Sequence, residues 1–286
     1  YHASKQYAEE RAQGRLLTNK DPNTPPTLIK NHPDVQRMLY FQKAIVEGSM
    51  GLLFQCFMWD DLAKSLDGEA KKEAQMMLDL MTTVAKTYPA EMGTQAVNQG
   101  LQVLGGYGYT EDFPLEQMAR DVRIMSIYEG TTGIHGLTLL GRGIPANNGA
   151  ALQTLGKLVY ADIAVAKGHE NLSKYAEMLE KELENLTTVT MHKLGFAMKG
   201  EIEVFLADST LYMELFGLIT VAWQWLKQGH VAAAALAKGG LNAEDEAFYK
   251  DKIHTMKFFY HYEVPKALGL SKRLMDEEVL TIFDHK

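Results

Sequence analysis

The residue best suited to chemistry in this sequence is a glutamate near the middle of the chain. Glu129 follows Ile127-Tyr128 and precedes Gly130, in a segment with little other charge. Apolar surroundings disfavour the charged form of a carboxylate, which suits such a group to accept a proton near neutral pH. On this pattern alone, an ordinary structural glutamate is the more frequent alternative.

Two motifs upstream of Glu129 have ordinary structural interpretations when each is taken alone. Gly105-Gly106 follows an apolar helical pattern, and glycine is the residue that most often ends a helix. No strand pattern precedes these glycines, so they do not fit the dinucleotide-binding turn that joins a strand to a helix. Arg120-Asp121 is interpreted as a structural ion pair.

The sequence gives no support for metal, thiol or nucleic-acid chemistry. The nine histidines include no HxxxH or HExxH pair, so we expect no metal site. The one cysteine, Cys56, has no base or positive charge nearby and is expected to be a buried thiol in a reducing compartment. The net charge is -7 and no block of Lys and Arg is present, which argues against a nucleic-acid partner.

The apolar stretches of the sequence are short. None approaches the ~20 residues that span a bilayer, and no signal peptide is visible. A cytoplasmic location is therefore predicted, or the mitochondrial matrix in a eukaryote. The chain begins at Tyr1, already within a helical pattern, so we expect it to be part of a longer protein.

Helical periodicity covers almost the whole chain, and strand-like alternation is missing, so the predicted fold class is all-α. Pro33 suits the first turn of a helix, Tyr88-Pro89 is expected to end one, and Asn242 with Asp245 suits a helix start. The predicted helices cover residues 1–11, 33–57, 69–86, 89–104, a short segment after 112–114, 150–167, 171–199, 201–228 and 243–269.

Two segments are expected to interrupt the helices. Residues 21–26 contain three prolines, and residues 141–149 contain three glycines, a proline and two asparagines. We place a domain boundary in the second segment, which gives domains 1–148 and 149–286. The later domain is expected to be a helical bundle whose large side chains are packing residues, among them Met198, Phe205, Tyr212, Trp223 and Trp225.

Several motifs of residues 1–143, in this order, resemble the signature of the acyl-CoA dehydrogenase family. The first is the early run from Tyr7 to Arg15. It is followed by Gln102 with Gly105-Gly106, then Pro114-Leu115-Glu116, Arg120-Asp121 and the run from Ile127 to Ile134. Each motif alone is weak, but the ordered set is specific. The resemblance implies the all-α C-terminal bundle of that family, followed here by a second helical bundle.

The resemblance also implies a reaction. Glu129 matches the base that removes the α-proton of an acyl-CoA thioester while the β-hydrogen leaves as hydride to FAD. Gly130 matches the neighbouring glycine, where a missing side chain leaves room for the acyl chain. A backbone N–H at the glutamate would help to polarise the thioester carbonyl.

Further positions match family contacts to the cofactor and to partners. Arg11 and Gln13 correspond to residues on the pyrophosphate side of FAD, and Thr131 to a contact near the base. Gln102, Gly105 and Gly106 correspond to the adenosine side, across a subunit contact. Implied partners are acyl-CoA, electron-transfer flavoprotein as acceptor, and further copies in a homodimer or dimer of dimers.

Some features depart from the short members of the family. Gly14 follows Gln13 directly, residues 21–26 form an insert, Gly133 replaces a frequent glutamine, and His135 is a weak candidate. The insert and the long extension point to a subclass that includes enzymes resembling 3-methylmercaptopropionyl-CoA dehydrogenase. The segment alone is expected to be inactive without the family's N-terminal and β-domains. The alternative is a non-catalytic helical interaction or oligomerisation module that retains inherited residues.

Overall fold

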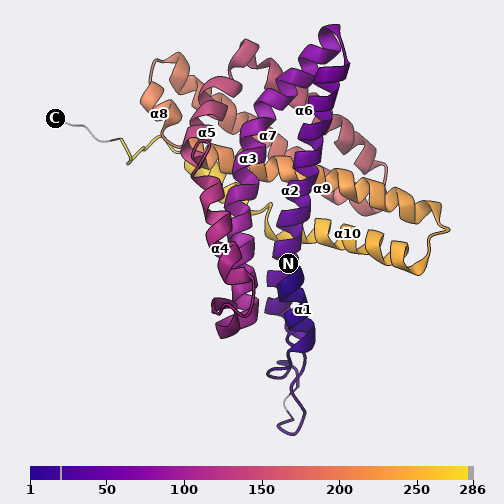
Figure 1. Cartoon of the computed structure of the whole chain (residues 1–286). Helices are drawn as coiled ribbons and strands as arrows, with labels where there is room; N and C mark the ends of the chain where they lie inside the picture. The colour runs from indigo at the N-terminus through magenta and orange to yellow at the C-terminus, as the bar shows by residue number, and fades with distance from the viewer. Residues whose placement is uncertain (20, 283–286) are drawn as a thin grey trace. The chain divides into compact units, whose positions relative to one another are not determined.

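The computed structural model describes residues 1–19 and 21–282, and most of these residues form helices, which are joined by turns and loops (Figure 1). Within the described residues no strand is formed, and one isolated antiparallel bridge joins Ala12 to Leu28, so the all-α prediction is confirmed. The elements are α1 (His2–Glu10), η1 (Ile29–Asn31), α2 (Pro33–Ser65), α3 (Gly68–Leu104), η2 (Gly105–Tyr109), α4 (Leu115–Arg123), η3 (Ile124–Ser126), α5 (Thr132–Thr138), η4 (Leu139–Gly143), α6 (Ala146–Lys167), α7 (Glu170–Met198), α8 (Ile202–Leu206), α9 (Ser209–Lys238), α10 (Ala243–Tyr262) and α11 (Lys266–Leu274).

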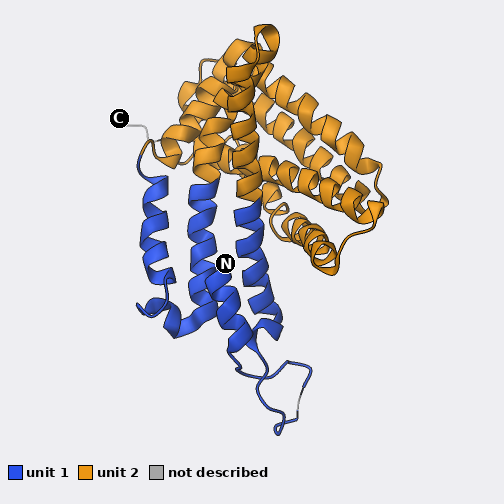
Figure 2. Ribbon diagram, turned by 45° about the vertical axis from the view of Figure 1, so that its right-hand side comes forward, with its two compact units in different colours: residues 1–47, 89–128 blue, residues 48–88, 129–286 orange. Residues whose placement is uncertain are grey.

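The chain divides into two compact units, which Figure 2 shows in blue and orange. Unit 1 contains residues 1–47 and 89–128, and unit 2 contains residues 48–88 and 129–286. Each unit thus draws on segments that are far apart in the sequence. This division into units does not test the domain boundary predicted between residues 148 and 149, which stays a prediction.

Unit 1 is built around a small apolar core. Buried side chains from α1, η1, α2, α3 and α4 meet there: Ala8, Ile29, Met38, Leu39, Val103, Leu104 and Leu115. Tyr7 packs edge-on against Phe113, with ring centroids 5.6 Å apart. A Cβ at Gly100 would lie 3.2 Å from Leu115, so this glycine allows α4 to approach α3 closely.

Unit 2 is built around α9, which is buried along most of its length and contacts α5, α6, α7, α10 and α11. Trp223, Trp225, Tyr212 and Phe205 are buried, as predicted. Met198 is not a packing residue, because its side chain is 79% exposed. It is the last residue of α7, where the chain turns away through Lys199 and Gly200.

Pro89 does not end a helix, contrary to prediction, because α3 continues through it to Leu104. An internal proline removes one backbone hydrogen bond and costs about 3 kcal/mol in isolation. Burial offsets this cost, since Val84, Tyr88 and Ala90 are all buried around the proline. Tertiary packing therefore overrides the local signal to stop.

Two predicted helices of the extension are each divided. The segment 201–228 contains all of α8 and the first part of α9. Between them lies Asp208, whose carboxylate pairs with Arg273 at 3.2 Å. The segment 243–269 is divided at Pro265, which precedes α11. The predicted start of α10 is confirmed, because the Asp245 N–H donates to the Asn242 side chain at 2.8 Å.

The glycine- and asparagine-rich segment 141–149 is more helical than expected. Residues 139–143 form a π-helical turn, and α6 begins at Ala146. The break is confined to Asn147, Asn148 and Gly149, which all have positive φ. Asparagine and glycine tolerate this conformation better than other residues, which explains the composition of the segment.

Candidate functional site

Glu129 lies in a strained turn between η3 and α5. Its φ is +53°, and Gly130 follows with φ of +90°. Among the residues that the structure describes, two other non-glycine residues, Asn147 and Asn148, have positive φ. Asparagine adopts this conformation readily, whereas a glutamate does so at a cost of about 1–3 kcal/mol, and such strain clusters at functional sites.

Both carbonyl groups of this turn are held by side chains. The Glu129 carbonyl lies 3.1 Å from Nε2 of His135, and the Gly130 carbonyl accepts a hydrogen bond from Nζ of Lys86 at 2.5 Å. The hydroxyl of Thr131 caps α5 by accepting from the Ile134 N–H at 3.3 Å. The predicted residues 129–131 are therefore contiguous in one fixed turn.

The Glu129 carboxylate is exposed and makes no hydrogen bond or ion pair with any described residue. The neighbouring apolar side chains are also exposed, with Tyr128 at 47% and Ile134 at 54%. The apolar enclosure expected from the sequence is therefore not made by this chain. What the chain supplies is a free carboxylate on a fixed backbone.

Four of the residues predicted to contact the cofactor line one recess of about 420 Å³ in unit 1, namely Arg11, Gln13, Gln102 and Gly105. Arg11 and Gln13 follow the C-terminal end of α1, and Gln102 and Gly105 lie at the end of α3. Ile29, Val103 and Leu104 add buried apolar surface. Gly106 follows Gly105 directly but is not among the lining residues.

Backbone hydrogen bonds hold the loop that carries Arg11 and Gln13. The Ile29 N–H donates to the Arg11 carbonyl at 2.8 Å, and the Gln13 N–H donates to the Thr27 carbonyl at 2.9 Å. The insert 21–26 is tied to the same loop, because the Arg15 guanidinium bonds the carbonyls of Pro22 and Thr24. The side chains of Arg11, Gln13 and Gln102 have no partner among the described residues and are available to a ligand.

His32 is a lining residue that the sequence did not identify. Its Nε2 lies 2.8 Å from the Gln13 carbonyl, and a Cβ at Gly14 would lie 3.7 Å from the same ring. That distance is an ordinary van der Waals contact, and the feature that favours glycine at this position is its φ of +68°. The only sequence signal was the step His32-Pro33 at the start of α2.

The predicted ion pair between Arg120 and Asp121 is wrong. Arg120 pairs with Glu116, one turn earlier on α4, and Asp121 accepts a hydrogen bond from Gln117 at 3.4 Å. Neighbouring residues on a helix point in different directions, whereas residues four apart share a face. Arg120 is exposed and Glu116 is partly buried, and both interactions are formed within α4 itself.

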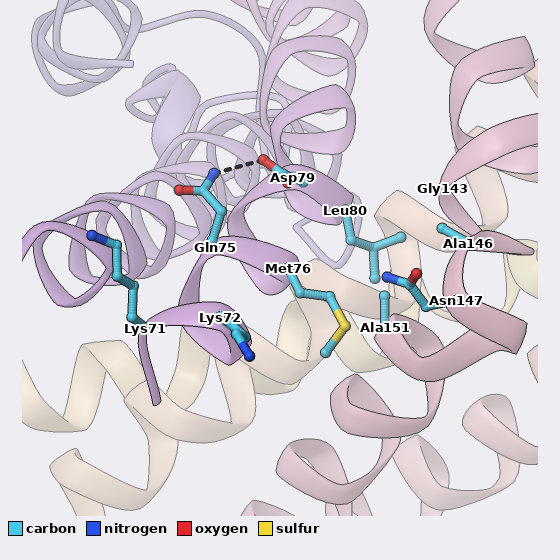
Figure 3. Close-up of a pocket in the computed structure, with 10 residues that line it drawn as sticks. All are labelled: Lys71, Lys72, Gln75, Met76, Asp79, Leu80, Gly143, Ala146, Asn147 and Ala151. Carbon is cyan, nitrogen blue, oxygen red and sulfur yellow. Dashed lines mark hydrogen bonds between the residues drawn. The ribbon is translucent and has the colours of Figure 1, made fainter. Parts of the chain in front are cut away.

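A second recess, of about 420 Å³, lies in unit 2 between the start of α3 and the η4–α6 segment (Figure 3). Figure 3 shows Gln75 bonded to Asp79 along α3, with Asn147 on the opposite side. Lys71, which also lines this recess, makes no hydrogen bond or ion pair with the described part of the chain. None of the predicted site residues lines this recess.

Metal-ligand clusters and membrane-spanning helices are absent from the described residues. Within residues 1–19 and 21–282, no three His, Cys, Asp or Glu side chains group as metal ligands. The helices in that part of the chain include none long and apolar enough to cross a membrane. Cys56 is buried, as predicted, and burial raises the pKa of its thiol to about 11.

Comparison with family models accounts for most of the chain. Residues 29–144 match the model described as acyl-CoA dehydrogenase, C-terminal domain, and residues 154–282 match the model described as acetyl-CoA dehydrogenase C-terminal like. The chain belongs to the acyl-CoA dehydrogenase family. The two matches lie on either side of the turn at residues 147–149.

Similar curated proteins carry the same family name. The chain is 31% identical to the broad-specificity linear acyl-CoA dehydrogenase FadE5 of Mycobacterium tuberculosis, over 89% of this chain and 43% of that protein. It is 30% identical to the 3-methylmercaptopropionyl-CoA dehydrogenase of Ruegeria pomeroyi, over 96% and 46% respectively. The chain thus spans less than half the length of these relatives.

Solved structures share the fold. The Caenorhabditis elegans ACDH-11 structure in complex with C11-CoA aligns with a TM-score of 0.68 and 23% identity, covering 91% of this chain and 38% of that one. A Bacillus anthracis acyl-CoA dehydrogenase complexed with FAD aligns with a TM-score of 0.68 and 20% identity, covering 95% and 45%. At these identities the likeness establishes the helical architecture.

Proposed function

We propose that this chain is the C-terminal part of an FAD-dependent acyl-CoA dehydrogenase, in which Glu129 removes the α-proton of an acyl-CoA thioester. The observation that carries the proposal is the strained turn of Glu129, whose carboxylate is free while its backbone is fixed. Strain at a glutamate is retained where surrounding contacts enforce it, and such contacts are a mark of functional sites.

The reaction needs a base, a hydride acceptor and a way to acidify the α-carbon. The Glu129 carboxylate would accept the α-proton, and bound FAD would supply the acceptor for the β-hydrogen and its electron pair. The N–H of Glu129 donates to no described residue, so it is free to bond the thioester carbonyl and stabilise the developing negative charge. Gly130, which has no side chain, leaves room for the acyl chain beside the base.

The recess in unit 1 fits one end of the cofactor. The Arg11 guanidinium presents unpaired donors that suit phosphate oxygens, and the Gln13 and Gln102 amides add further polar contacts. The C-terminal end of α3 carries partial negative charge, which suits the hydroxyl and amino donors of the adenosine half rather than the phosphates. Gly105, Gly106 and Thr131 are proposed as further cofactor contacts from family correspondence.

The assembly and the extension belong to the same proposal. We infer a homodimer or a dimer of dimers, acyl-CoA as substrate and electron-transfer flavoprotein as acceptor. Residues 149–286 form the second proposed domain, a helical bundle that supports the enzyme and carries no chemistry, and residues 283–286 lie outside the described part. The cytoplasmic or matrix location remains a prediction.

The test is the replacement of Glu129 by glutamine in the full-length gene product. Loss of the base should slow bleaching of the bound flavin by acyl-CoA by at least ~10²–10⁴-fold, while FAD and acyl-CoA still bind. Glu116→Gln, which changes a carboxylate that pairs with Arg120 on α4, is the control and should reduce normally. Near-normal flavin reduction in Glu129→Gln would exclude this residue as the base.

The same measurements on the wild-type protein distinguish the dehydrogenase from the alternative, a non-catalytic helical interaction module. A wild-type protein that assembles but neither retains FAD nor reacts with acyl-CoA would favour the helical interaction module. An assembled protein that retains FAD and bleaches with acyl-CoA supports the dehydrogenase. A panel of acyl-CoA chain lengths then identifies the preferred substrate.

A further inference from the structure

We propose that Lys86 is a positioning residue for the catalytic base: it holds the Glu129-Gly130 turn in its strained conformation by bonding the Gly130 carbonyl. The inference rests on the proposed role of Glu129. Lys86 lies on α3, 44 residues away in sequence, and no motif of the family resemblance includes it. The sequence does not predict its hydrogen bond to the turn, which only the folded structure shows.

The side chain of Lys86 starts from a rigid part of α3. The residues around it on the helix are buried, with Val84 at 0%, Thr87 at 1% and Tyr88 at 6% exposed. Lys86 itself is half-buried, and its Nζ donates to the Gly130 carbonyl at 2.5 Å. A hydrogen bond from an ammonium group is stronger than one between neutral groups, particularly where water is partly excluded.

The turn needs such an anchor. A glutamate with φ of +53° followed by a glycine with φ of +90° is a sparsely populated conformation, which persists where surrounding contacts enforce it. His135 supplies one contact from α5, which directly follows the turn, but this contact is local. Lys86 supplies the contact that ties the turn to a separate helix of unit 2.

The consequence concerns the direction of the carboxylate. The Glu129 side chain makes no hydrogen bond or ion pair with the described residues, so its position depends on the backbone that bears it. A base that is misplaced by about 1 Å can lose ~10²-fold in rate, even when the substrate still binds. Lys86 therefore acts on the proton-transfer step through Glu129 and does not touch the substrate.

The experiment compares three variants in the full-length gene product. Lys86→Met removes the ammonium and keeps most of the volume, Lys86→Arg keeps the donor, and Lys71→Met changes a lysine of the same helix that makes no hydrogen bond or ion pair with a described residue. We expect flavin reduction at saturating acyl-CoA to fall ~10–100-fold in Lys86→Met, with FAD content and KM unchanged. Reduction should be largely restored in Lys86→Arg and unaffected in Lys71→Met.

An isotope effect distinguishes positioning from a loss of folded protein. If Lys86 positions the base, slower proton abstraction should enlarge the α-deuterium isotope effect in Lys86→Met. A variant with lower activity but the wild-type isotope effect, or with the wild-type rate, overturns the inference while the dehydrogenase function stands. A wild-type protein that acyl-CoA does not reduce overturns the proposed function, and with it this role of Lys86.

Discussion

A Cβ atom at Gly48 would lie 2.6 Å from the indole nitrogen of Trp225, so α2 and α9 meet at a point where no side chain can be added. The same added Cβ would lie 2.6 Å from Val221, one turn earlier on α9. Close by, Lys227 of α9 donates to the Gln55 side chain at 2.5 Å. The extension thus packs directly on a helix of the family domain within unit 2.

Gly48→Ala should therefore destabilise the protein. The added methyl group meets a buried, rigid tryptophan, and overpacking of this kind typically costs about 1–3 kcal/mol. Gly195→Ala, in α7, is the matched control, because nothing lies within 4 Å of a Cβ added there. That change should stabilise the helix by about 0.5–1 kcal/mol. Urea denaturation of both variants measures the difference, and equal stabilities would contradict the close contact.

Arg11→Ala should weaken retention of FAD more than binding of acyl-CoA. Arg11 lines the recess of unit 1 and has no partner among the described residues, so its guanidinium is free for a phosphate. Loss of a charged hydrogen bond typically costs about 1.5–3 kcal/mol, which corresponds to roughly 10–100-fold in affinity. FAD content after dialysis is the measurement.

A matched control for Arg11 is available in the same unit. Arg37 pairs with Asp34 at 2.7 Å on the first turns of α2 and does not line the recess. Arg37→Ala should retain FAD as the wild type does. If Arg11→Ala and Arg37→Ala lose the same amount of flavin, the assignment of Arg11 to the phosphate side is wrong.

Local signals in the sequence predicted the helices well. Pro33 starts α2, Asn242 caps α10, and Gly105, with φ of +60°, ends α3, each for a reason confined to a few residues. The failures at Pro89 and Asp208 have a different origin. There, burial or an ion pair with a distant residue decides where the helix continues or stops, and periodicity does not contain that information.

The candidate site also combines features that the local sequence predicts with features that depend on contacts between distant residues. Glu129 was identified from its motif, but its positive φ appears in the structure alone, and the hydrogen bond that holds the next carbonyl, at Gly130, comes from Lys86, 44 residues away from Gly130. The family resemblance named Arg11 and Gln102 separately, and the fold brings them to one recess. His32 was missed because its role depends on a hydrogen bond to the Gln13 carbonyl, which leaves no trace in composition or spacing.

The stability of the protein should fall between pH 9 and about pH 11 because of Cys56. Burial favours the neutral thiol and raises its pKa from the ordinary 9.0 to about 11. The folded state therefore holds this proton more tightly than the unfolded state. Its contribution to stability is complete below pH 9 and is lost as the pH rises towards 11.

The comparison with Cys56→Ala isolates this effect, since both proteins share the buried tyrosines whose pKa values are also raised, such as Tyr88 and Tyr260. The difference in unfolding free energy between wild type and Cys56→Ala should shrink between pH 9 and pH 11. Denaturation curves across this range measure it. A difference that is constant with pH would show that the thiol is not desolvated in the folded protein.

Gly130→Ala should impair the reaction by distorting the turn of Glu129. Alanine is strained at φ of +90°, and its Cβ would lie 2.8 Å from Nε2 of His135, which holds the Glu129 carbonyl. The strain costs about 1–3 kcal/mol and is relieved when the turn moves, which carries the carboxylate with it.

Gly133→Ala is the control three residues later, because its Cβ would meet neighbours at 3.8 Å or more. Flavin reduction should slow by roughly 10²-fold in Gly130→Ala and stay near the wild-type rate in Gly133→Ala. Equal rates in the two variants would show that the geometry of the turn does not control the base.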